Sequence, residues 1–162
     1  MADNTTPAAA ANTAQSADKQ IMLQRMYVKD CSFESPRSPA IFGTSFTPEI
    51  TVNMHTNAQP LEDGNVEVVL QMTAEASHEE RTVFLVEVQQ AGLFTLKGFN
   101  EQEQAMILAS YCPNILFPYL REVVSDLTLK GGMAPLILQP VNFDALYAQQ
   151  AGLQAAGNGG GN

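Results

Sequence analysis

The chain has 162 residues, a net charge of −9 and a hydrophobic fraction of 45%. This length fits one domain, since domains usually run to about 100–200 residues. The acidity argues against nucleic acid and against anionic membranes as partners, because both attract basic surfaces. A basic protein partner would suit this charge, although solubility alone explains an acidic surface equally well.

Cysteine content and hydropathy favour the cytosol. Cys31 and Cys112 make a poor disulfide framework for a chain of this size and fit free thiols in a reducing compartment. No run of about 18 apolar residues could span a membrane, and the alanines near the N-terminus follow no basic segment of the kind that begins a signal peptide. We therefore expect a cytoplasmic protein without direct membrane insertion.

Both ends of the chain lack apolar periodicity. Residues 1–18 are rich in Ala, Thr, Asn and Gln, and residues 152–162 consist of Gly, Ala, Leu, Asn and Gln. Such compositions are typical of disordered segments. We expect an N-terminal arm, one folded domain over residues 19–151 and a disordered C-terminal tail.

Alternating apolar and polar residues predict β-strands in the first half of the domain. The alternation starts in residues 21–28 and recurs in residues 50–54, 66–74 and 82–94, with the two-residue period of a half-buried strand. Connections too short for parallel crossovers predict four antiparallel strands. A long loop, residues 35–48, has three prolines but also large apolar residues, and such loops are usually functional or packed over a core.

The second half reads as helices. Asn100 followed by Glu103 resembles a capping box and predicts a short helix to about residue 110. Asn114 predicts the cap of a second helix that ends at Gly131 and Gly132. A third helix is expected from Phe143 to about residue 151. Strands followed by helices predict the α+β class.

The sequence lacks the motifs of catalysis and cofactor binding. It has no Gly-rich phosphate loop, no Gly-x-Ser-x-Gly and no Cys-x-x-Cys. Its two histidines, His55 and His78, are too few for a metal site with two isolated cysteines. We therefore expect no catalytic residue, no cofactor and no metal.

Carboxylates occupy unusual positions on the predicted strands. Asp30 and Glu34 fall on one face of the first strand, and Glu87 shares a face with Leu85 on the last. A leucine is unusual on a fully solvated sheet face, and a glutamate is unusual in a core. The pattern indicates an interaction face, with a solvated sheet face as the alternative.

Several segments resemble the SecB family of bacterial protein-export chaperones. They are residues 27–34, 84–90, 109–122 and 138–146, in the family's order and across nearly the whole expected domain. The run Tyr-Cys-Pro-Asn-Ile-Leu-Phe-Pro-Tyr at residues 111–119 is highly specific. The resemblance implies a four-stranded antiparallel sheet with helices, assembled as a dimer of dimers, without catalysis or bound nucleotide.

The resemblance also implies partners and site residues. Its clients would be unfolded precursors of secreted proteins, passed to the motor ATPase SecA. The SecA contacts implied are Asp30, Glu34, Leu85 and Glu87. The positions implied in tetramer assembly are Val86, Val88 and Gln90. A client groove is implied between the long loop and the second helix, with the candidates Ile41, Phe42, Phe46, Leu116, Tyr119, Leu120 and Val123.

Two alternatives stay open from the sequence. One is a small-ligand enzyme built on a sheet and a long helix, which turnover or a retained cofactor would support. The other is a SecB-like chaperone dedicated to a single partner, such as an antitoxin. The uncharged end of the chain, residues 151–162, differs from the charged tail of many SecB proteins and leaves open whether a tail contributes to SecA binding.

Overall fold

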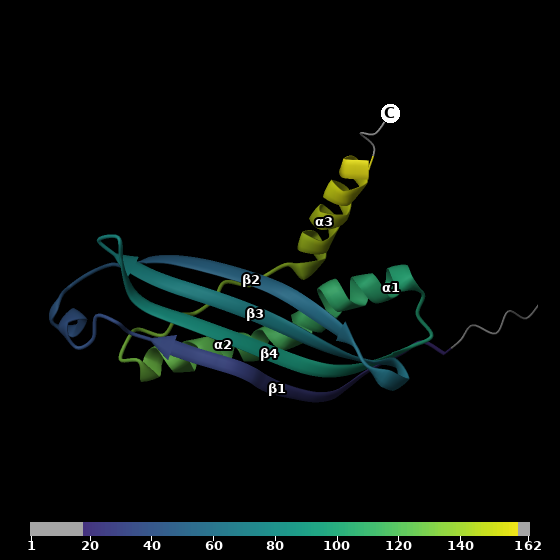
Figure 1. Cartoon of the computed structure of the whole chain (residues 1–162), viewed down its shortest axis with the longest axis horizontal. Helices are drawn as coiled ribbons and strands as arrows, with labels where there is room; N and C mark the ends of the chain where they lie inside the picture. The colour runs from purple at the N-terminus through teal and green to yellow at the C-terminus, as the bar shows by residue number, and fades with distance from the viewer. Residues whose placement is uncertain (1–17, 159–162) are drawn as a thin grey trace, which may run out of the picture.

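One antiparallel sheet forms the framework of the computed structural model, which describes residues 18–158 (Figure 1). Its strands are β1 (Gln20–Glu34), β2 (Glu49–Pro60), β3 (Asn65–His78) and β4 (Arg81–Lys97). The prediction of four antiparallel strands is confirmed. The expected N-terminal arm, apart from Asp18, lies outside the described residues.

The strand order is β1-β4-β3-β2, so the first two strands of the chain form opposite edges of the sheet. The loop of residues 35–48 therefore connects the two edges at one end of the sheet, and it contains the short helix η1 (Ala40–Gly43) (Figure 1). At the other end, β2 and β3 are joined through η2 (Glu62–Gly64), where Asp63 and Gly64 both have positive φ.

Three helical segments follow one another without a break: α1 (Glu101–Met106), the π-helical turn η3 (Ile107–Tyr111) and α2 (Cys112–Lys130). The predicted capping box is confirmed, since Asn100 accepts a 2.9 Å hydrogen bond from the Glu103 amide and the Glu103 carboxylate accepts one from the Asn100 amide. The predicted end at Gly131 is also confirmed.

The expected break before a capping Asn114 is wrong. Asn114 lies inside α2, one residue after Pro113. A proline inside a helix removes a hydrogen bond and crowds the carbonyl four residues earlier. The π-helical turn widens the backbone just before Pro113 and lets the helix continue.

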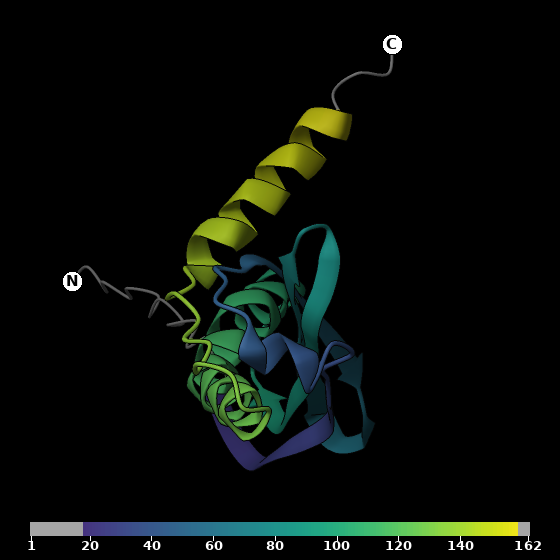
Figure 2. The same ribbon diagram turned by 90° about the vertical axis from the view of Figure 1, so that its left-hand side faces the viewer.

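The third helix, α3 (Phe143–Asn158), begins where the sequence predicted but continues seven residues beyond the expected boundary. The expectation of a disordered tail from residue 152 is therefore corrected for residues 152–158. Alanine, leucine and glutamine are strong helix formers and outweigh the cost of Gly152 and Gly157, about 1 kcal/mol each. In Figure 2, α3 projects away from the sheet. Within residues 18–158 no helix is long and apolar enough to cross a membrane.

The core lies between α2 and the central strands. The side chains of Leu116, Leu120 and Val124, four residues apart on one face of α2, are fully buried. They cover the even-numbered residues of β3 and β4. At Gly92, an added Cβ would lie 3.0 Å from Leu116 Cδ2 and 2.6 Å from the Phe94 ring, so glycine permits the close approach of α2.

Leu120→Ala is expected to lower the free energy of unfolding by about 2–5 kcal/mol, because the site is fully buried and truncation leaves a cavity. Urea unfolding at fixed protein concentration measures the change. The neighbouring Tyr119→Ala is the matched control, because Tyr119 is 56% exposed and its truncation should cost less than about 1 kcal/mol. Equal losses for both variants would contradict this packing.

Candidate binding surfaces

The face of the sheet opposite α2 is left open by the described helices (Figure 2). Strand register places predicted SecA-contact residues together on this face, with Glu34 opposite Leu85 and Ser32 opposite Glu87. Asp30 is opposite Gln89, two residues from Glu87 on the same strand. Asp30, Glu34 and Glu87 are exposed and Leu85 is half-buried.

A bulge in β1 creates this arrangement. Tyr27 pairs with Ala91, but after the register shift between Val28 and Asp30, Asp30 pairs with Gln89. The extra residue reverses which β1 side chains point to the open face. Without the bulge, Asp30 and Glu34 would point toward the helices, away from Glu87.

Sequence reasoning missed one carboxylate of this surface. Glu75 on β3 lies opposite Leu85, is exposed, and accepts a 2.5 Å hydrogen bond from the Thr82 hydroxyl. The alternation along β3 places it on the polar face, but only the strand order brings it beside Leu85. We call Asp30, Glu34, Glu75, Glu87 and Leu85 the acidic sheet surface. Within residues 18–158 none of its four carboxylates has an ion-pair partner.

A hydrogen-bonded cluster lies beside the acidic sheet surface. Lys29 Nζ is 2.7 Å from Glu67 Oε2, and the Tyr27 hydroxyl donates to Glu67 Oε1. The hydrogen bonds from Lys29 and Tyr27 lower the pKa of Glu67. Burial, followed by the hydrogen bond to Glu67, raises the pKa of Tyr27 to about 12. The cluster therefore holds an ionised Glu67 between two donors from β1.

The predicted assembly residues occupy the opposite face of β4. Val86, Val88 and Gln90 are buried on the side covered by α2. The Gln90 amide donates to the Tyr27 carbonyl, while its Oε1 has no partner among the described residues. Any influence of these three residues on assembly has to pass through packing in the protomer's own interior.

Three predicted groove residues belong to the core. Leu116 and Leu120 are fully buried and Ile41 is 2% exposed. The expectation that they line an accessible groove is corrected, because the helical face that carries Leu116 and Leu120 packs on the sheet and Ile41 joins the same core cluster.

The remaining groove candidates are accessible, and two of them, Phe42 and Tyr119, lie near different parts of α2. Phe42 and Tyr119 are exposed, whereas Phe46 and Val123 are half-buried. The Phe42 ring packs against Gly132, beyond the end of α2, and lies 3.2 Å from the point that an added Cβ would occupy there. Tyr119 lies eleven residues before that end, about 16 Å along the helix axis.

The structure also shows apolar surface along β2. Ile50, Val52 and Met54 share the face of β2 that looks toward the helices. Ile50 and Val52 are exposed, because α2 covers the central strands and stops short of this edge. We call these three residues the β2 apolar strip. Its alternation was visible in the sequence, but its exposure was not.

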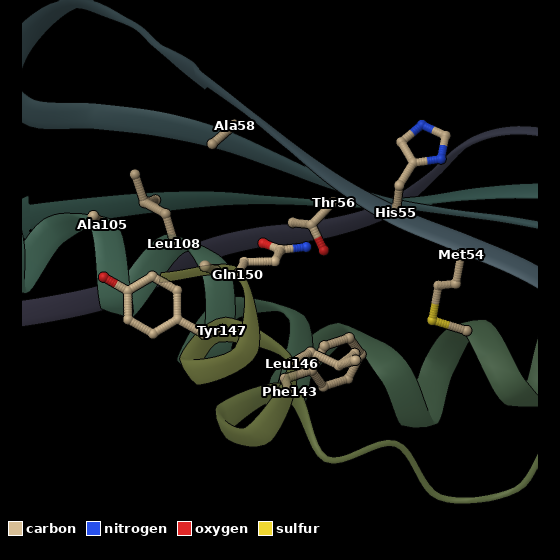
Figure 3. A pocket seen from close by; sticks show the side chains of 11 residues that line it. Met54, His55, Thr56, Ala58, Ala105, Leu108, Phe143, Leu146, Tyr147 and Gln150 are labelled. Carbon is tan, nitrogen blue, oxygen red and sulfur yellow. The ribbon is translucent and has the colours of Figure 1, made fainter. Parts of the chain in front are cut away.

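One end of this strip opens into a pocket of about 290 Å³ between β2, the α1–η3 segment and α3, called the β2–α3 pocket (Figure 3). Its apolar lining includes Met54, Leu108, Phe143, Leu146 and Tyr147. In Figure 3, His55 projects from the opposite side of β2 to Met54. Thr56 and Gln150 add polar groups to the lining, so the pocket combines an apolar wall with hydrogen-bonding side chains, and its size suits a small number of client side chains.

Comparison with known proteins decides the family. Residues 14–154 match the family described as preprotein translocase subunit SecB. The chain belongs to the SecB family. A protein-export protein SecB from Methylococcus capsulatus is 52% identical over 136 residues, covering 84% of this chain and 88% of that protein. Its counterpart in Nitrosococcus oceani is 49% identical over 152 residues, covering 93% and 92%.

The SecB fold is also present in a solved structure. A SecB-like chaperone of Mycobacterium tuberculosis, in complex with a peptide from an antitoxin, aligns with a TM-score of 0.57 at 20% identity. The alignment covers 75% of this chain and 88% of that one. At this identity the likeness concerns the fold, and it supports the α+β architecture of this SecB-family chain.

The chemistry of the site residues fits binding. The lining of the β2–α3 pocket contains no carboxylate, lysine or arginine. Burial raises the pKa of the Cys112 thiol to about 12, so a nucleophilic thiolate is disfavoured there at neutral pH. Cys31 is exposed, contrary to the usual burial of a structural cysteine. In the described part of this SecB-family chain no three His, Cys, Asp or Glu side chains are grouped to hold a metal ion.

Proposed function

We propose that this SecB-family export chaperone is a cytoplasmic dimer of dimers that holds unfolded precursor proteins and delivers them to SecA. The observation that carries the proposal is the separation of two surfaces. Carboxylates gather on the open face of the sheet, and accessible apolar side chains gather on the other face along β2. One protein can therefore hold an apolar client and a basic partner at the same time.

Client binding is assigned to the β2 apolar strip and the β2–α3 pocket. An extended client segment would lay its side chains on Ile50, Val52 and Met54 and insert one into the pocket. Each large apolar side chain buried contributes about 1.5–3 kcal/mol before the cost of ordering is subtracted. The peptide complex of the SecB-like chaperone from Mycobacterium tuberculosis supports a peptide-binding role for this fold.

SecA binding is assigned to the acidic sheet surface. Its carboxylates are exposed and carry no internal ion pair among the described residues, so their charge is available to a cationic partner. Opposite potentials accelerate encounter and select the partner. Leu85, in their midst, supplies an apolar contact. Neither nucleic acid nor a membrane suits this charge.

Assembly is assigned to the β1 edge and the outer side of the α1–η3 segment. Exposed Met22, Val28, Met106 and Tyr111 lie there in the isolated protomer. Met22 and Val28 lie on opposite faces of β1, so both faces of this edge offer apolar contacts to a second protomer. Val86, Val88 and Gln90 would act on assembly indirectly, because their packing in the core positions β1 and the helices that carry this surface.

The decisive experiment combines aggregation suppression of an unfolded precursor with SecA binding, and uses light scattering for the mass of the assembly. Suppression, SecA binding and a tetrameric mass are expected together. A monomer that suppresses nothing would refute the proposal. Capture of one dedicated partner, with no activity on precursors, would favour the single-partner alternative.

A further inference from the structure

Lys29 is the cation nearest in sequence to the acidic sheet surface, since it directly precedes Asp30. Its long side chain is 44% exposed and could reach several carboxylates. A lysine ammonium among these carboxylates would make the surface less negative and weaken its attraction for a basic partner. The structure shows this ammonium elsewhere, 2.7 Å from Glu67 on β3.

Strand register places Glu67 on the far side of Lys29 from the acidic sheet surface. Along β4, Leu85 and Glu87 belong to that surface, whereas Glu67 pairs with Leu93. Leu93 lies six positions after Glu87, about 20 Å along a strand. The ion pair with Glu67 therefore draws the ammonium of Lys29 away from Glu87.

Burial and two hydrogen-bond donors hold the Glu67 carboxylate in one position. Its side chain is only 14% exposed, and the Tyr27 hydroxyl holds its second carboxylate oxygen. Tyr27 pairs with Ala91, which pairs in turn with Val69 on β3. The small side chain of Ala91 leaves room for the Tyr27 ring to lean across β4 toward Glu67. Hydrogen bonds from both donors keep Glu67 ionised.

We infer that Glu67 is a positioning residue for partner docking, which sequesters the Lys29 ammonium so that the acidic sheet surface keeps its full negative charge. The inference rests on the proposed SecA-binding role of that surface. Loss of the Glu67 charge frees the Lys29 ammonium to pair with the carboxylate of Asp30 or of Glu87. The net charge of the surface then becomes less negative by one unit.

The test measures SecA binding to the full-length assembly for four proteins: the unmodified chain, Glu67→Gln, Lys29→Gln and the double variant. Glutamine keeps the shape of Glu67 and can still accept the Tyr27 hydrogen bond. Glu67→Gln is expected to weaken binding about threefold to fivefold at low salt, the size of one exposed charge interaction. The double variant should return to within about twofold of the unmodified protein, because no lysine remains to be freed.

Two controls separate this effect from a structural one. Asp126→Asn releases Lys130 from an ion pair on α2, on the opposite side of the sheet from the acidic sheet surface, and should leave SecA binding unchanged. The difference between Glu67→Gln and the unmodified protein should disappear near 1 M salt, where the screening length is about 3 Å. A purely structural role of Glu67 would predict neither the salt dependence nor the rescue.

Three results would overturn the inference. They are unchanged binding in Glu67→Gln, a double variant as weak as Glu67→Gln, and a loss that persists at high salt. If Glu87→Lys lowers SecA binding while Glu67→Gln does not, the inference fails and the proposed docking surface stands. If the unmodified protein does not bind SecA, both fail.

Discussion

Glu87→Lys is expected to weaken SecA binding by at least about tenfold, equivalent to 1.4 kcal/mol, with client holding unchanged. Glu87 is exposed at the centre of the acidic sheet surface. It lies on β4 between Leu85 and Gln89, the residue that pairs with Asp30. Reversal replaces an attraction with a repulsion against a basic partner. Binding of SecA to the intact assembly, measured at low and high salt, gives the size and the electrostatic share of the loss.

The matched control is Glu62→Lys, which changes the net charge equally. Glu62 is exposed in the η2 turn, at the end of the sheet far from Glu34. It should bind SecA as the unmodified protein does. Simultaneous loss of SecA binding and aggregation suppression in Glu87→Lys, with the tetramer preserved, would contradict two separate surfaces.

Val52→Glu is expected to weaken client binding about tenfold to a hundredfold, because it removes an apolar contact worth about 1.5–3 kcal/mol and places a charge where apolar groups must dock. Val52 is 42% exposed on an edge strand, so the folded protomer tolerates the change. Aggregation suppression and direct binding of an unfolded precursor measure the effect, and SecA binding should not fall.

Thr51→Glu is the control for this variant. Thr51 is the adjacent residue, has its side chain on the opposite face of β2, and is exposed. The added charge is the same, but the client surface is not touched. If Thr51→Glu reduces client binding as much as Val52→Glu does, net charge is responsible and the β2 apolar strip is not the client site.

The two surfaces differ in how well sequence patterns anticipated them. Asp30, Glu34, Leu85 and Glu87 were expected on an interaction face, and register brings all four to the open side of the sheet. Their role in binding SecA stays a prediction. The client groove was predicted less well: apolar residues at helical spacing, such as Leu116 and Leu120, are what both a groove and a core require, and burial places these two in the core.

Local chemistry explains what could be predicted from the sequence by itself. The two-residue alternation of the strands, the capping box at Asn100 and the helix end at Gly131 depend on residues a few positions apart. The segment at residues 111–119 is specific enough to indicate the SecB family by its residues alone, and the family match over residues 14–154 confirms it.

Tertiary structure alone decided which residues of different strands share a surface. The order β1-β4-β3-β2 brings Glu75 beside Leu85, and one extra residue in β1 turns Asp30 toward Glu87. The position of α2 leaves Val52 uncovered, and the pairing of distant strands draws Lys29 to Glu67. Such outcomes depend on register between segments far apart in the chain, where a one-residue shift exchanges the two faces of a strand.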